Sequence, residues 1–190
     1  MFSQTKQQLS RAVDPFARFF INLGLSPNQI TIAGFILGLA TSYIIATGYL
    51  LYGGLLILLC GFFDILDGAV ARLSGRMTPF GGILDSTTDR LVDASLLIGI
   101  GISGTANWPL IALAITFSLL VSYVRARSEA TGLIKKLDAG IAERAERMII
   151  LSLGLIAGFI WEAVILLILL SLTTVIWRLV EAKRLIERKE

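Results

Sequence analysis

Long uninterrupted runs of hydrophobic residues dominate the chain, and short segments with glycine, proline or charged residues separate them. A helix needs about 20 mostly apolar residues to cross a bilayer. Six runs come close to this length, and they extend approximately over Gln29–Leu50, Tyr52–Leu73, Phe80–Ser103, Pro109–Arg127, Arg144–Trp161 and Ala163–Val180. The pattern therefore predicts an all-α integral membrane protein with six transmembrane helices.

The first 25 residues follow a different pattern, because hydrophobic residues recur there at helical spacing between charged ones. This pattern predicts an N-terminal amphipathic helix, residues 1–25, that lies in the membrane interface. Ser26, Pro27 and Gln29 then fit the N-cap, N1 and N3 positions of a capping box, and Thr78-Pro79 opens the third span in a similar way. Residues 26–183 form the predicted six-helix bundle, and we expect residues 1–190 to be a single domain.

The composition and the placement of charge support a membrane protein. Hydrophobic residues make up 55% of the chain and charged residues only 16%, unlike a soluble domain. The 17 basic residues lie at or near the two termini and two loops, whereas the loops around residues 47–53, 101–109 and 158–162 contain none. By the positive-inside rule, we expect both termini to be cytosolic in a multi-pass protein of the cell membrane. Membrane topology therefore explains the net positive charge of +3, and nucleic-acid binding is not needed to account for it.

Five aspartates lie within the second and third predicted spans, although an unpaired charge at the bilayer centre costs at least about 2.5–3.5 kcal/mol. These residues are Asp64, Asp67, Asp85, Asp89 and Asp93. The first four form i, i+3 and i, i+4 pairs near the cytosolic ends of neighbouring antiparallel helices. The chain has no histidine and one cysteine, Cys60, so an all-oxygen site for Mg²⁺ or Mn²⁺ fits better than a zinc site.

Two other interpretations of the acids are open. They can pair with Arg72, Arg76 and Arg90 as helix-end salt bridges, but buried ion pairs stabilise poorly. They can also serve a cation transporter, but the acids stop on the cytosolic side and the outer half of every span is apolar. Two roles are open for Asp93: it can support the metal ligands from beside them, or it can pair with an arginine.

The residues from Asp64 to Asp89 read Asp-x₂-Asp-Gly-x₂-Ala-Arg-x₈-Gly-x₃-Asp-x₃-Asp, with eight fixed positions in one frame. This motif resembles the signature of the CDP-alcohol phosphatidyltransferase family. The resemblance implies transfer of a lipid-phosphate group from a CDP-lipid to a hydroxyl of a polar acceptor, with release of CMP. It further implies that Asp64, Asp67, Asp85 and Asp89 hold metal, with two ions per active site, and that Asp89 is the general base. The residues that it implies for CDP-lipid binding are Asn28, Gln29, Ile30, Thr31, Gly68, Arg72 and Thr78.

Arginines near the cytosolic ends of spans four to six suggest a phosphorylated acceptor. Arg125, Arg144 and Arg178 can converge beside the acids, and guanidinium groups bind a phosphate dianion well. Tyr123-Val-Arg-Ala-Arg and the stretch from Gly140 to Arg147 look like the phosphatidylinositol phosphate synthases of the family, although Ala145 replaces their usual proline. The resemblance adds Arg147 to the acceptor site, inositol phosphate as acceptor, CDP-diacylglycerol or CDP-archaeol as donor, and a homodimer. Glycerol 3-phosphate is the nearest alternative acceptor.

Overall fold

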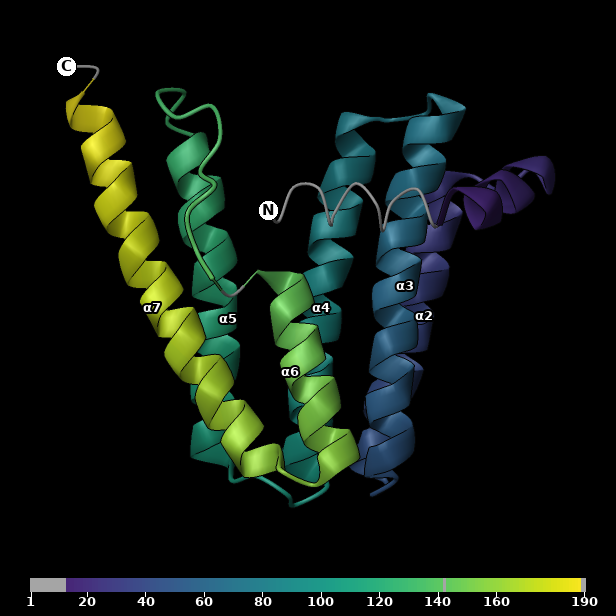
Figure 1. The fold of residues 1–190 in the computed structure, drawn as a ribbon, viewed down its shortest axis with the longest axis vertical. Helices are drawn as coiled ribbons and strands as arrows, with labels where there is room; N and C mark the ends of the chain where they lie inside the picture. Colours follow the sequence, from purple (N-terminus) through teal and green to yellow (C-terminus); the bar gives the residue numbers. More distant parts are fainter. Residues whose placement is uncertain (1–12, 142, 189–190) are drawn as a thin grey trace.

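A computed structural model describes residues 13–141 and 143–188 of the chain, and this described part is helical with no strand. Residues 13–22 are helical, and the following elements are α2 (Pro27–Ala46), α3 (Leu50–Ser74), α4 (Pro79–Ile102), α5 (Trp108–Glu129), α6 (Arg144–Ala157) and α7 (Ile160–Glu187). Figure 1 shows α2 to α7 as an up-and-down bundle, with the α3–α4 and α5–α6 connections at one end. Within it, α2 packs on α3 and α4, α6 on α3 and α7, and α5 on α4 and α7.

Local sequence signals account for the helix starts. The predicted capping box at α2 is confirmed: the backbone N–H of Ser26 donates to Gln29 Oε1 at 2.8 Å, and the Ser26 side chain accepts from the Gln29 N–H. Thr78 caps α4, as predicted, and Asn107 caps α5 in the same manner. These caps satisfy backbone N–H groups that have no partner inside the helix.

Among the described residues, four helices are long and apolar enough to cross a membrane, namely α2, α3, α5 and α7. The other two differ from the expected spans: α4 carries several charged side chains, and α6 has only 14 residues. The predicted fifth span ends early because Gly158 adopts φ 78°, a left-handed conformation that favours glycine and ends a helix. The last span was predicted to end at Val180, but α7 continues to Glu187.

The described part of the predicted interfacial helix runs sideways beside α2 and α3, near the end of the bundle that carries the α3–α4 connection (Figure 1). Val13 and Ala17 are buried against Ile30 of α2 and Leu66 of α3. Residues 1–12, where the prediction places the rest of this helix, lie outside the described residues. Apolar packing on α2 and α3 thus holds the described turns of this helix.

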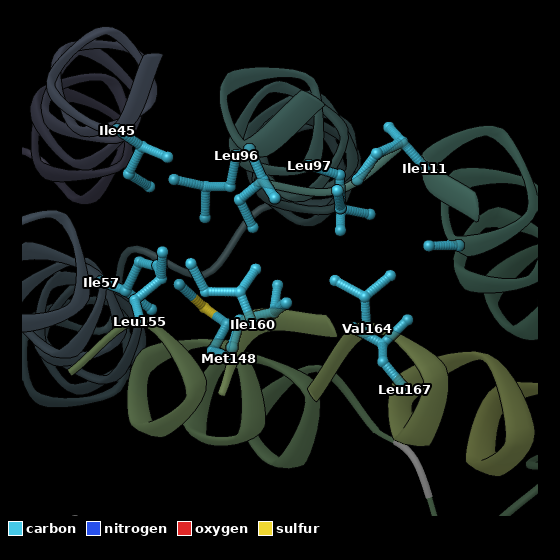
Figure 2. Close-up of a cluster of buried hydrophobic side chains, with 14 of the residues drawn as sticks. Ile45, Ile57, Leu96, Leu97, Ile111, Met148, Leu155, Ile160, Val164 and Leu167 are labelled. Atoms are coloured by element: carbon cyan, nitrogen blue, oxygen red, sulfur yellow. The ribbon is translucent and has the colours of Figure 1, made fainter. Parts of the chain in front are cut away.

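The main hydrophobic core fills the half of the bundle away from the aspartates. Figure 2 shows side chains from α2 to α7 that point toward one another, including Ile57 of α3 and Leu96 of α4. Asp64 and Asp67 follow Ile57 along α3 by two to three turns, and Asp89 and Asp93 precede Leu96 along α4. The core therefore extends up to the acidic residues, and it fixes the two helices that carry them.

Candidate active site

Three of the predicted metal ligands lie together between α3 and α4. One oxygen each of Asp64, Asp67 and Asp85 lies within 4.8 Å of the other two. Asp67 is the most buried of the three, and the hydroxyl of Thr31 donates to its Oδ2 at 2.7 Å. The helical spacing of these aspartates in the sequence thus predicted a real cluster, and α2 contributes a hydrogen bond to it through Thr31.

The chemistry of this cluster fits a hard divalent cation. Carboxylate groups this close repel one another, and a cation that several oxygens contact removes the repulsion. Oxygen donors are the ligands that Mg²⁺ and Mn²⁺ prefer. The donor set present therefore fits the metal that the sequence predicts.

Asp89, the fourth predicted ligand, contacts arginines in this structure. Its Oδ1 lies 2.9 Å from Arg144 Nη1, and its Oδ2 lies 3.4 Å from Arg90 Nη1. The same Arg144 Nη1 lies 2.6 Å from Asp64 Oδ1, although it is not aligned for a hydrogen bond with either carboxylate. Arg144 of α6 thus stands between α3 and α4 as a counter-charge to the acids. Sequence reasoning placed Arg144 beside the acids as a ligand of the acceptor phosphate, but it did not predict that Arg144 pairs with the acids themselves.

The structure places Asp93 in an ion-pair network with two arginines. Its Oδ1 accepts from Arg144 Nε at 3.3 Å, and its Oδ2 accepts from Arg147 Nη2 at 2.8 Å. Arg147 is itself buried, with 4% of its surface exposed. Of the two roles open for Asp93, pairing with an arginine is the one seen here.

A cavity of about 190 Å³ opens beside the acidic cluster. Several residues predicted to bind the CDP-lipid line it, together with two of the acids: Asn28, Thr31, Gly68, Thr78, Asp67 and Asp85. Gly81 keeps this space open, because a Cβ there would lie 3.0 Å from Thr78 Oγ1 and 3.2 Å from Asn28 Oδ1. Arg76 and Met77 also line the cavity. Sequence reasoning missed them as site residues, because the motif leaves their positions variable.

Other residues predicted for CDP-lipid binding have different places. The side chain of Gln29 closes the capping box of α2, and Ile30 is buried in the cluster beneath the first helix. Arg72 lies over Gly68, since a Cβ on this glycine would be 3.2 Å from Arg72 Nη1. Gln29 and Ile30 thus stabilise the start of α2, whereas Arg72 lies next to Gly68, which lines the cavity.

The other arginines predicted for the acceptor make contacts of their own. Arg125 Nε donates to Glu129 Oε1 at 3.2 Å on the surface of α5. Arg178 is 2% exposed, and it donates to the backbone carbonyls of Val121 and Ala139. Arg178 therefore joins α7 to α5 and to the α5–α6 connection. Of the four acceptor arginines, Arg144 is the one with ion pairs to the metal-ligand aspartates among the described contacts.

Comparison with known proteins extends over nearly the whole chain. The family model for CDP-alcohol phosphatidyltransferases matches residues 24–177. The archaetidylinositol phosphate synthase of Pyrococcus horikoshii is 38% identical over 98% of this chain and 99% of its own length. The enzyme of the same name from Methanothermobacter thermautotrophicus is 42% identical over 95% of this chain and 93% of its own length.

Solved structures with a similar fold come from an enzyme of the same kind as these relatives. The crystal structure of the Mycobacterium tuberculosis phosphatidylinositol phosphate synthase with CDP-DAG bound has a TM-score of 0.81 and 31% identity, and it covers 90% of this chain and 94% of that chain. The same enzyme in complex with manganese and citrate also has a TM-score of 0.81, over 90% of this chain and 88% of that chain. Family model, relatives and fold all agree with the motif on α3 and α4, and the chain belongs to the CDP-alcohol phosphatidyltransferase family.

Proposed function

We propose that this protein transfers a lipid-phosphate group from a CDP-lipid to a hydroxyl of inositol phosphate and releases CMP. The observation that carries the proposal is the acidic cluster of Asp64, Asp67 and Asp85 beside a cavity lined by other residues of the motif. Relatives named archaetidylinositol and phosphatidylinositol phosphate synthases support the acceptor and leave CDP-archaeol and CDP-diacylglycerol as the two donor classes. Glycerol 3-phosphate is the alternative acceptor.

In this proposal Asp64, Asp67, Asp85 and Asp89 hold two Mg²⁺ or Mn²⁺ ions. When bound, the ions neutralise the pyrophosphate of the donor and polarise the reacting groups. Asp89 takes the proton of the acceptor hydroxyl, which requires direct contact with that hydroxyl. The Mycobacterium tuberculosis relative forms a complex with manganese, which supports a metal in the proposed reaction.

The donor and the acceptor occupy different parts of the site. We assign the CDP moiety to the cavity at Asn28, Thr31, Gly68 and Thr78, which adjoins Asp67 and Asp85. Arg72, Gln29 and Ile30 support this pocket from its edge. The acceptor phosphate is assigned to the arginines of α5, α6 and α7, namely Arg125, Arg144, Arg147 and Arg178. Donor and acceptor then meet at Asp64 and Asp89, which Arg144 contacts from α6.

The orientation in the membrane follows from the basic loops. We propose that the chain is a single domain with six spans in the cell membrane, preceded by an interfacial helix, and that the termini and the acidic cluster face the cytosol. The α3–α4 and α5–α6 connections, which carry basic residues, lie at the same end of the bundle (Figure 1). We also propose that the protein is a homodimer, because stripes of small residues on its helices allow close packing between helices and because the family resemblance implies one.

An acceptor panel tests the proposed reaction. The purified protein is incubated with CDP-diacylglycerol or CDP-archaeol and Mg²⁺, and CMP release is followed with inositol phosphate, glycerol 3-phosphate, inositol or serine. We expect inositol phosphate to support the highest rate. A preference for glycerol 3-phosphate would replace the inositol assignment, and a preference for serine would contradict a phosphate-binding site.

Arginine variants test the acceptor site within the same assay. We expect Arg125→Ala and Arg178→Ala to raise the KM for inositol phosphate, because loss of a charge-assisted contact costs about 1.5–3 kcal/mol, or roughly ten- to a hundredfold in affinity. Arg127→Ala is the matched control, since Arg127 lies on α5 two residues from Arg125 and is exposed. An unchanged KM in both site variants would exclude these arginines from acceptor binding.

A further inference from the structure

Arg144 contacts aspartates that the proposed reaction assigns to metal. Its Nη1 lies 2.6 Å from Asp64 Oδ1 and 2.9 Å from Asp89 Oδ1, so one guanidinium nitrogen contacts acids from both α3 and α4. Only 14% of the Arg144 side chain is exposed, which leaves these contacts poorly screened by water. A permanent cation therefore lies against two of the four carboxylates.

Asp93 holds this guanidinium by its other end. Arg144 Nε donates to Asp93 Oδ1, and the second oxygen of Asp93 accepts from Arg147, one turn farther along α6. Asp93 is 9% exposed and lies one turn beyond Asp89 on α4. With Nε bound to Asp93, the Nη1 end reaches Asp64 and Asp89. One part of the guanidinium thus binds Asp93, and another part contacts the two metal-ligand aspartates. We call the hydrogen bond between Arg144 Nε and Asp93 the tether.

We propose that Arg144 is a resident cation that shares Asp64 and Asp89 with the divalent metal, and that Asp93 is the positioning residue that keeps it there. This inference rests on the proposed function, because it takes these aspartates to be metal ligands. Two cations on the same carboxylates repel each other, so Arg144 lowers the affinity for metal. The tether prevents the bound metal from displacing the arginine, which leaves a guanidinium beside the metal for an incoming phosphate.

A titration with Mn²⁺ tests the shared site without either substrate. Free Mn²⁺ is measured by electron paramagnetic resonance in detergent-solubilised protein. We expect Arg144→Met to bind Mn²⁺ about tenfold more tightly than the parent, because a unit charge next to two ligands is removed. Arg127→Met is the matched control with unchanged Mn²⁺ affinity, since Arg127 lies on α5 and is exposed.

Arg144→Lys tests the tether while Asp93 stays intact. A single ammonium group keeps the charge, but it cannot bind Asp93 through one nitrogen and Asp64 and Asp89 through another. The untethered lysine yields its place to the metal, so we expect a Mn²⁺ affinity close to that of Arg144→Met. Thermal unfolding checks that each variant is folded, and Arg144→Gln replaces the methionine variant if the latter is not.

The possible results separate the inference from the proposed function. Parent-like or weaker Mn²⁺ binding by the neutral Arg144 variants would overturn the shared site. Parent-like Mn²⁺ binding by Arg144→Lys would overturn the role of the tether, because a positive charge without the contact to Asp93 would then be sufficient to lower the affinity for Mn²⁺. A parent protein that binds no Mn²⁺ would overturn the metal site of the proposed function itself, and the inference with it.

Discussion

Thr31 offers a sharp test of how α2 supports the metal site. Its hydroxyl donates to Asp67 Oδ2 at 2.7 Å and also lies 3.2 Å from the carbonyl oxygen of Pro27. Thr31→Val has nearly the same shape and removes the hydroxyl, so the change deprives a buried carboxylate of one side-chain donor without opening a cavity. A hydrogen bond to a charged group contributes about 1.5–3 kcal/mol. Loss of a partner that orients a metal ligand lowers metal affinity by about 10–100-fold.

The measurement is the dissociation constant of Mn²⁺ by the same resonance titration, followed by the KM for the CDP-lipid. We expect Thr31→Val to weaken Mn²⁺ binding within the stated range. Thr41→Val is the matched control on the same helix: Thr41 is fully buried, but its hydroxyl donates to Leu37 O at 2.8 Å and faces Cys60. Unchanged Mn²⁺ affinity with a raised KM for the CDP-lipid would refute the reasoning, and it would assign Thr31 directly to the donor.

Three further outcomes are expected. Asp67→Asn abolishes turnover and leaves the circular dichroism spectrum unchanged, because it removes a charge from the buried cluster; full turnover of the parent in excess EDTA would argue against any metal requirement. Asp89→Asn lowers kcat much more than it weakens CDP-lipid binding, because a general base acts on the acceptor; equal losses would make Asp89 chiefly a metal ligand. Gly99→Ala destabilises the fold by about 1–3 kcal/mol in thermal unfolding, because overpacking has costs of this size. Its Cβ would lie 2.5 Å from the carbonyl oxygen of Ser42, whereas Gly61→Ala is a control with open space.

The sequence by itself determined the helical architecture and the composition of the acidic cluster. Runs of apolar residues, the capping box at Ser26 and the spacing of Asp64, Asp67 and Asp85 are local patterns, and helical periodicity converts them directly into faces and ends of helices. The family resemblance rested mainly on the same short stretch, because all eight fixed motif positions lie on two consecutive helices, α3 and α4.

Only the tertiary structure decided which distant side chains meet. Arg144 is 80 residues after Asp64 in the chain, and its position between Asp64 and Asp89 depends on how α6 packs against α3. No local pattern distinguishes it from Arg178, whose donors instead bind backbone carbonyls of Val121 and Ala139. Helical periodicity acts over a few residues, whereas a charge pairs with whatever the packing of helices brings within reach.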